Sequence, residues 1–199
     1  MYQLVLASES PRRKQILETN GFVFDVVPVK VSEIPDKNLN IDEQILDIAS
    51  RKANAAFALL KSTLDKPFVL LAADTMVVYH EQTLGKPRNQ DEAYEFLRLL
   101  SGKTHEVKTG LMLVESLGGK RLSHLETSRV KFRELSDDEI WTYIQSGEPM
   151  DKAGAYAIQG IGQRLVEKFE GDYDNIVGLP AQVFTRLLSE SGWQIRKLS

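Results

Sequence analysis

The chain has 199 residues, of which 42% are hydrophobic and 27% are charged, a balance typical of a soluble globular protein rather than a disordered chain. The formal net charge of -3 gives no overall attraction to nucleic acid, so we expect no nucleic acid polymer as a partner. The lack of cysteine excludes disulfides and thiolate catalysis, and the lack of a basic leader or a long apolar run predicts a cytoplasmic chain without membrane contact.

Hydrophobic periodicity predicts an α/β chain. In chain order, we expect a strand at 2–6, a helix at 11–19, a strand at 22–27, a helix at 41–61, a strand at 68–79, a helix at 90–100, strands at 106–114 and 122–132, and helices at 137–145 and 179–191. The last two strands are joined around Gly118 and Gly119, which favours an antiparallel hairpin and hence a mixed, twisted sheet with flanking helices. Because no Pro-rich or Ser-rich linker interrupts the chain, residues 1–199 are expected to form one domain whose two lobes share the sheet.

The segment after the first strand combines hydroxyl and basic side chains. Ser10 can cap the next helix, and Pro11 suits the first helical position. Cations normally avoid a helix N-terminus, so Arg12 and Arg13 need a negative partner there, for which phosphate is the natural candidate. The alternative is that both arginines are solvated and the serines only cap the helix.

The helix expected at 41–61 carries a lysine within its apolar face. At about 100° per residue, this face is expected to hold Lys52 together with Ile41, Ile45, Ile48, Ala55 and Leu59. Such a lysine either extends its stem out to water or meets an anion, and the pattern alone favours the first arrangement.

The apolar run 68–79 is broken only by Asp74 and Thr75. A carboxylate in a buried strand is unfavourable unless it is paired, hydrogen-bonded or bound to a metal, so Asp74 is expected to have a specific partner. It is the best catalytic candidate, either as a ligand of a divalent ion or as a proton acceptor from water. The alternative is an Asp that starts a turn between two shorter strands.

Two loops carry further polar candidates. Lys86 follows a predicted tight turn and lies where a loop could close over the Asp74 site, although loop lysines are mostly only solvated. Gln159 lies in the glycine-rich segment 151–162, where a backbone can approach a ligand closely and an amide can read a base edge. A purely structural glycine-rich turn is the alternative reading of that segment.

Several segments, taken together, resemble the Maf family. They are ASESPRR at 7–13, AADT at 72–75, GKP at 85–87, LSGKTHEV at 100–107, DKAGAYAIQG at 151–160, and GDY with NIVGLP between 171 and 180. They occur in the family's order and span nearly the whole chain. The resemblance implies a mixed α/β fold like that of the inosine triphosphate pyrophosphatases (Maf/Ham1), with two lobes around a central cleft.

The same resemblance implies a nucleoside triphosphate pyrophosphatase, which cleaves between the α- and β-phosphates with a divalent cation, Mg²⁺ or Mn²⁺. Asp74 matches the family's proton acceptor, and Glu33 matches an acidic position that would bind the metal or water beside it. The positions that match phosphate-facing residues are Ser8, Arg13, Lys52 and Lys86. A homodimer is also implied.

Three positions of the resemblance bear on the substrate. Arg12, Thr75 and Gln159 match the branch that prefers dTTP and UTP, whereas the branch that acts on 7-methyl-GTP carries Trp, Gln and Glu there. Ala157 stands where the family usually has glycine, and would stiffen the loop if that position requires a positive φ. Two alternatives stay open: 7-methyl-GTP specificity, and a non-enzymatic nucleotide-binding regulator of septum formation, the phenotype that named the family.

Overall fold

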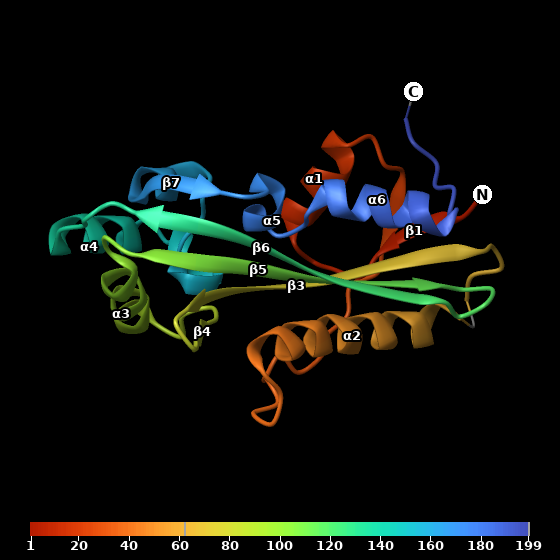
Figure 1. Ribbon diagram of the computed structural model, residues 1–199, viewed down its shortest axis with the longest axis horizontal. Coiled ribbons are helices and arrows are strands. Elements are labelled where there is room, and N and C mark those ends of the chain that lie inside the picture. Colours follow the sequence, from red (N-terminus) through yellow and green to blue (C-terminus); the bar gives the residue numbers. More distant parts are fainter. Residues whose placement is uncertain (62, 199) are drawn as a thin grey trace. The chain divides into compact units, whose positions relative to one another are not determined.

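The computed structural model describes residues 1–61 and 63–198 and contains a seven-stranded mixed sheet with flanking helices (Figure 1). The strands are β1 (Gln3–Leu6), β2 (Phe24–Val26), β3 (Phe68–Tyr79), β4 (Gln82–Leu84), β5 (Thr104–Glu115), β6 (Arg121–Phe132) and β7 (Val166–Glu170). Their order is β2-β1-β3-β5-β6-β7, with β4 paired to β3. β1 is parallel to β2 and β3, whereas the β3–β4 and β6–β7 pairs are antiparallel, which confirms the predicted mixed α/β sheet.

The expected helices and strands are all present. The helices are α1 (Pro11–Thr19), α2 (Ile41–Leu60), α3 (Gln90–Leu100), α4 (Asp137–Gln145), α5 (Tyr173–Val177) and α6 (Ala181–Ser191), with 3₁₀ helices η1 (Glu148–Asp151), η2 (Ala153–Ala155) and η3 (Gly160–Leu165). The sequence did not predict β4, β7, α5 or the 3₁₀ helices. These elements are short, so they show too few repeats of a hydrophobic period to be recognised.

The chain divides into two compact units. Unit 1 contains Met1–Asp74, Thr109–Glu126 and the segment from Gly178 onward, and unit 2 contains Thr75–Lys108 and Thr127–Val177. Unit boundaries fall inside β3, β5 and β6, so these strands contribute residues to both units. The expected single domain with a central cleft stays a prediction.

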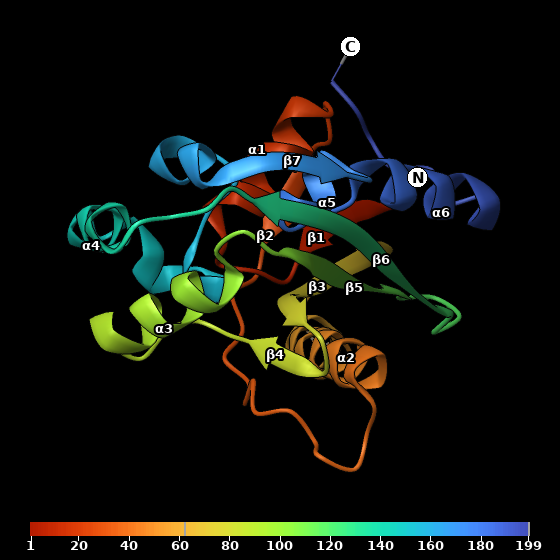
Figure 2. The ribbon, with the colours of Figure 1, turned by 60° about the vertical axis from the view of Figure 1, so that its left-hand side comes forward.

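In unit 1, helix α2 covers one face of the strands, and helices α1 and α6 cover the other (Figures 1 and 2). Successive side chains of a strand alternate between the two faces, so Leu70, Ala72 and Asp74 of β3 share a face. Leu70 and Ala72 lie in a buried cluster with alanines of α2, namely Ala49, Ala53 and Ala56. Because Asp74 lies on the same face of β3 as Leu70 and Ala72, its side chain also faces α2.

The buried face of α2 differs from the predicted one. Its buried residues are Ile45, Ile48, Ala49, Lys52, Ala53, Ala56 and Leu60. The prediction was wrong for Leu59, which is 56% exposed, and Ile41 and Ala55 are only half-buried. Because α2 is rich in alanine, its apolar residues extend around more of the helix than one face. Periodicity alone therefore does not show which of two overlapping apolar faces is buried. The helix comes so close to β5 that a Cβ on Gly110 would lie 3.0 Å from the Ile45 side chain.

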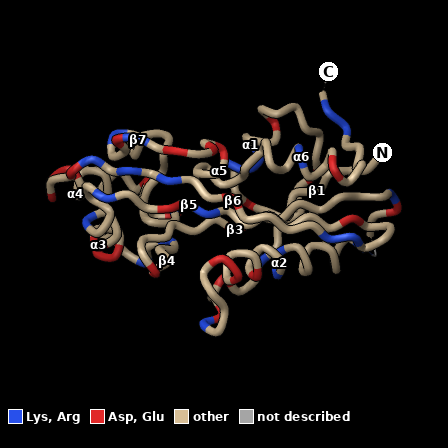
Figure 3. The backbone as a smooth tube through the Cα atoms, viewed as in Figure 1, with Lys and Arg blue, Asp and Glu red and all other residues tan. Residues whose placement is uncertain are grey.

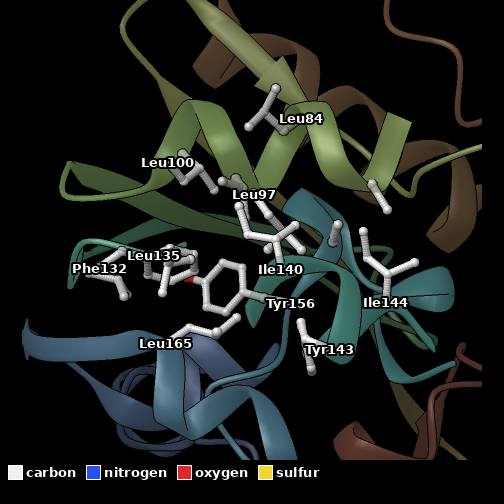
Figure 4. Close-up of a cluster of buried hydrophobic side chains, with 14 of the residues drawn as sticks. Leu84, Leu97, Leu100, Phe132, Leu135, Ile140, Tyr143, Ile144, Tyr156 and Leu165 are labelled. Atoms are coloured by element: carbon white, nitrogen blue, oxygen red, sulfur yellow. The ribbon is translucent and has the colours of Figure 1, made fainter. Parts of the chain in front are cut away.

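Unit 2 has its own apolar core, part of which is drawn in Figure 4. Side chains of α3, α4 and β6 gather around the ring of Tyr156 there. The labelled members of the cluster are Leu84, Leu97, Leu100, Phe132, Leu135, Ile140, Tyr143, Ile144, Tyr156 and Leu165. This core holds the glycine-rich segment that contains Tyr156 against regular helices and strands.

A histidine is buried in the core of unit 2. His105 is 2% exposed, its Nε2 lies 2.7 Å from the Tyr156 hydroxyl, and its ring packs edge-on against Phe132. Its Nδ1 is buried without a hydrogen-bond partner. Burial lowers the pKa of His105 from 6.5 to about 4, so the folded protein holds this imidazole in its neutral form.

This buried histidine predicts a loss of stability in mild acid. Because the pKa of His105 is lower in the folded than in the unfolded state, the unfolded chain binds the extra proton. The contribution of neutral His105 to the free energy of unfolding is fully present above about pH 6.5 and is lost as the pH falls toward 4. We expect a loss of roughly 3 kcal/mol in the free energy of unfolding across this window. Urea unfolding at several pH values measures it, and a His105→Gln variant should lack this part of the pH dependence.

Acidic and basic residues are interspersed along both units, with neither sign confined to one of them (Figure 3). A site for a polyanion must therefore come from a local arrangement of cations rather than from a general field. Among the described residues, no helix combines the length and the apolar character needed to cross a bilayer.

Candidate active site

Ser8 follows the carboxyl end of β1, and Asp74 lies in the neighbouring strand β3, just beyond the part of β3 that pairs with β1. The two strands are parallel and in register from Gln3 with Phe68 to Leu6 with Leu71. The N–H of Ala7 still bonds the Leu71 carbonyl at 2.8 Å, just before the chain leaves β1. β1 lies between β2 and β3, and the helices that follow β1 and β2 cover opposite faces. Ligands of α/β sheets bind at the carboxyl ends of strands where the chain changes direction in this way.

The predicted cap at the start of α1 is confirmed. The Ser10 hydroxyl accepts a hydrogen bond from the N–H of Arg13 at 3.5 Å, and Pro11 is the first helical residue. Ser8 accepts from the N–H of Ser10 at 3.2 Å and from Nη1 of Arg13 at 3.3 Å. The hydroxyls and the guanidinium thus form one hydrogen-bonded group at the end of β1.

Arg13 is a buried cation, 9% exposed, rather than a solvated surface residue. Its Nε donates to the carbonyl of Gly178 at 2.8 Å. Gly178 has a φ of 128°, in a region that residues with side chains rarely adopt. Burial lowers the pKa of Arg13 and the charge of Asp74 opposes this shift. A desolvated guanidinium favours an anion beside it, and the binding of phosphate by Arg13 stays a prediction.

Asp74 has the partner that its burial required. Its Oδ1 lies 2.7 Å from Nζ of Lys52, and the same Nζ lies 2.6 Å from Oε1 of Glu33. The side chains of Lys52 and Asp74 are 11% and 9% exposed, whereas that of Glu33 is 49% exposed. Because β3 runs unbroken through Asp74, the alternative of a turn between two strands is wrong. The expectation that Lys52 reaches out to water is also wrong, since its ammonium joins two carboxylates.

Arg51 holds the segment that presents Glu33. Its guanidinium donates to the carbonyl of Ser32 and, at 3.0 Å, to that of Ile34. It also pairs with Asp47 one helical turn earlier, at 3.0 Å. The sequence did not identify this role, because contacts with backbone carbonyls leave no residue pattern. α2 therefore supplies both the cation between the carboxylates and the cation that fixes one of them.

Glu33 and Asp74 converge on a single cation, which makes them the candidate metal ligands of unit 1. Mg²⁺ is commonly held by one or two carboxylates together with substrate phosphates and water, so this pair of oxygen donors fits it. No group of three or more acidic or histidine side chains suited to a metal occurs within residues 1–61 and 63–198. A metal here would need substrate oxygens to complete its ligands.

The remaining predicted site residues are divided between the two units. Arg12 is half-buried in the first turn of α1 in unit 1. In unit 2, Thr75 is half-buried on β3, Lys86 is exposed after β4, and Gln159 is half-buried just before η3. Their contact with a ligand stays a prediction.

Alanine in place of the family's usual glycine at position 157 causes no backbone strain. Of the non-glycine residues in the described part of the chain, those with positive φ are His80 and Ala155. Ala157 therefore does not need the conformation that would favour glycine, and the concern about this position is removed.

The chain is similar to known proteins over nearly its whole length. The family model described as Maf-like protein matches residues 3–191. A protein of Bdellovibrio bacteriovorus named dTTP/UTP pyrophosphatase is 60% identical over 187 residues, which cover 94% of this chain and 97% of the relative. A protein of the same name from Caldicellulosiruptor bescii is 41% identical over 197 residues, covering 99% and 98%. A crystal structure of a nucleoside-triphosphatase, or dITP/XTP pyrophosphatase, from Mycobacterium abscessus aligns with a TM-score of 0.42 at 11% identity, over 95% of this chain and 94% of that one.

Proposed function

Because this chain belongs to the Maf-like protein family, we propose that it is a nucleoside triphosphate pyrophosphatase, which hydrolyses dTTP and UTP to the monophosphate and pyrophosphate. The observation that carries the proposal is the buried pair of Asp74 and Lys52 beside the Ser8 and Arg13 group, where β1 ends next to the middle of β3. This arrangement offers a carboxylate base next to cations that bind phosphate. The names of the two relatives support the substrate.

In the proposed reaction, Asp74 accepts a proton from water as the water oxygen attacks the α-phosphorus. The bond between the α-phosphorus and the bridging oxygen breaks, and pyrophosphate leaves with that oxygen. Lys52 contacts Oδ1 of Asp74 at 2.7 Å and would hold the carboxylate in place for this step. Arg13 and Ser8 supply donors aimed at phosphate oxygens, and Lys86 is a further phosphate contact by resemblance.

Glu33 and Asp74 would hold the divalent cation, which we propose to be Mg²⁺ or Mn²⁺. When bound, such a cation neutralises charge on the phosphate oxygens. The positive charge of Lys52 is already shared between two carboxylates. The basic side chains of the site alone would therefore not neutralise the charge of a triphosphate.

We propose that Arg12, Thr75 and Gln159 select the pyrimidine nucleotide. They match the branch acting on dTTP and UTP at all three positions. A homodimer is proposed from the resemblance alone, and the cytoplasmic location expected from the sequence stays a proposal. Light scattering of the purified protein measures the oligomeric state.

The test is product analysis with a panel of nucleotides. Wild-type protein is incubated with dTTP, UTP, CTP, GTP and 7-methyl-GTP in the presence of Mg²⁺ or Mn²⁺, and chromatography separates mono- and diphosphate products. We expect dTTP and UTP to yield monophosphate and pyrophosphate in equal amounts. Release of inorganic phosphate and a diphosphate would contradict the cleavage position. Tight binding without turnover would favour the regulatory alternative.

A further inference from the structure

A carboxylate in unit 2 binds backbone amides of the loop that carries Gln159. Glu148, the first residue of η1, accepts a hydrogen bond from the N–H of Gly162 at 2.9 Å through Oε1. Its Oε2 accepts from the N–H of Ile161 at 3.1 Å. Both donors follow Gln159 closely in the chain, so this carboxylate fixes the loop on the C-terminal side of the glutamine.

The carboxylate of Glu148 also contacts Tyr143, whose hydroxyl binds the loop on the N-terminal side of Gln159. Tyr143 of α4 donates its hydroxyl to Oε1 of Glu148 at 2.8 Å. The hydroxyl oxygen accepts from the N–H of Ala157 at 3.2 Å. The Tyr143 ring is 3% exposed and belongs to the apolar cluster of Figure 4, so it is a rigid support. Gln159 therefore lies between two backbone anchors that share one carboxylate.

The glycines of the loop leave room for this arrangement. Gly160 has a φ of 68°, and a Cβ there would lie 2.6 Å from Oε2 of Glu148. At Gly162, a Cβ would lie 2.4 Å from the Ala157 carbonyl oxygen and 2.5 Å from the Tyr143 hydroxyl. All three distances are shorter than real Cβ contacts, so a side chain at either position would force the loop away from the carboxylate or the hydroxyl.

The carboxylate is ionised as it makes these bonds. Burial raises the pKa of Glu148, but the amides of Gly162 and Ile161 and the Tyr143 hydroxyl outweigh it and hold the pKa below its ordinary value. Hydrogen bonds to an ionised acceptor are roughly twice as strong as those between neutral groups. The loop is thus held by bonds that a neutral side chain of the same shape would weaken.

We propose that Glu148 and Tyr143 form a clamp that sets nucleobase selection by fixing the loop of Gln159, with Glu148 as its positioning residue. This inference rests on the proposed function, in which Gln159 reads the base. The clamp acts on the substrate only through Gln159. Its loss should therefore change the binding and ranking of nucleotides more than the chemical step.

The experiment compares wild type with Glu148→Gln, which keeps the shape but removes the charge and one acceptor oxygen. We expect the KM for dTTP to rise by roughly tenfold, the value of about one lost charged hydrogen bond, while kcat stays within about threefold. The ratio of kcat/KM for dTTP to that for GTP should fall by a similar factor. In hydrogen exchange, the amides of Ile161 and Gly162 should exchange faster in the variant.

Matched variants separate a clamp from a general loss of structure. Glu167→Gln makes the same chemical change at an exposed ion pair of unit 2 and should alter nothing. Tyr143→Phe removes only the hydroxyl and should have the same effect on the KM and on selectivity. This variant tests the clamp even if Glu148→Gln fails to fold. Adding Glu148→Gln to Gln159→Ala should cost no further selectivity, because the clamp works through the glutamine that is already lost.

Two results would overturn the inference. Unchanged selectivity in both clamp variants, with wild type turning over dTTP, would reject the clamp and leave the proposed function intact. Selectivity that falls further in the double variant than in Gln159→Ala alone would show that Glu148 does not act through Gln159. A wild-type protein that releases no pyrophosphate rejects the proposed function itself, and nucleobase selection with it.

Discussion

Asp74→Asn should lower kcat for dTTP by roughly 10²-fold or more, the usual contribution of a positioned general base. Asparagine keeps the shape and one oxygen facing Lys52, but its amide cannot accept the proton from water. The KM should change less than kcat, since the substitution leaves the Ser8 and Arg13 group, the proposed phosphate contact, in place. Pyrophosphate release at saturating dTTP measures the effect.

The matched control for this prediction is Asp65→Asn, the same change at an exposed position of unit 1. Its turnover should equal that of wild type. Thermal unfolding of Asp74→Asn should show a folded protein, because Lys52 keeps its contact with Glu33. Near-normal turnover in the folded variant would remove Asp74 from the role of proton acceptor.

Helix and strand positions could be read from the sequence where local signals are strong. α1, α3 and α4 have the predicted bounds because Ser10, Asn89 and Ser136 cap their starts through side-chain bonds to backbone amides. The bounds of β3 were also predicted, since a long apolar run rich in β-branched residues has few alternatives. The short elements β4, β7 and α5 depend on their neighbours in the sheet and on turns, so no local pattern marked them.

The candidate site could be predicted only in part. That Asp74 needs a partner follows from burial alone, but the identity of the partner does not. Lys52 was found on the apolar face of α2 and was expected to reach water, because a helix pattern does not show which strand residue faces it. The roles of Arg51 and Glu148 rest on backbone atoms of distant segments, and such contacts leave no trace in residue types.

Lys52→Met should lower the free energy of unfolding by roughly 3 kcal/mol or more, because it leaves a buried carboxylate without its partner. The methionine fills similar space but provides no charge for Asp74, whose side chain is 9% exposed. The kcat/KM for dTTP should also fall by roughly 10²-fold, because the proposed phosphate site loses a charged donor. Urea unfolding and pyrophosphate release measure the two effects. Lys61→Met, an exposed lysine at the end of the same helix, should change neither.

A double variant separates the structural from the catalytic role of Lys52. In Lys52→Met with Asp74→Asn, no unpaired charge remains at the buried position, so most of the lost stability should return. Activity should stay lost, because the double variant has neither the proton acceptor nor the cation. A double variant as unstable as Lys52→Met would mean that the aliphatic stem of Lys52, rather than its charge, supports the fold. Glu33 is half exposed and can be hydrated when Lys52 is absent, so the return of stability reports on Asp74 alone.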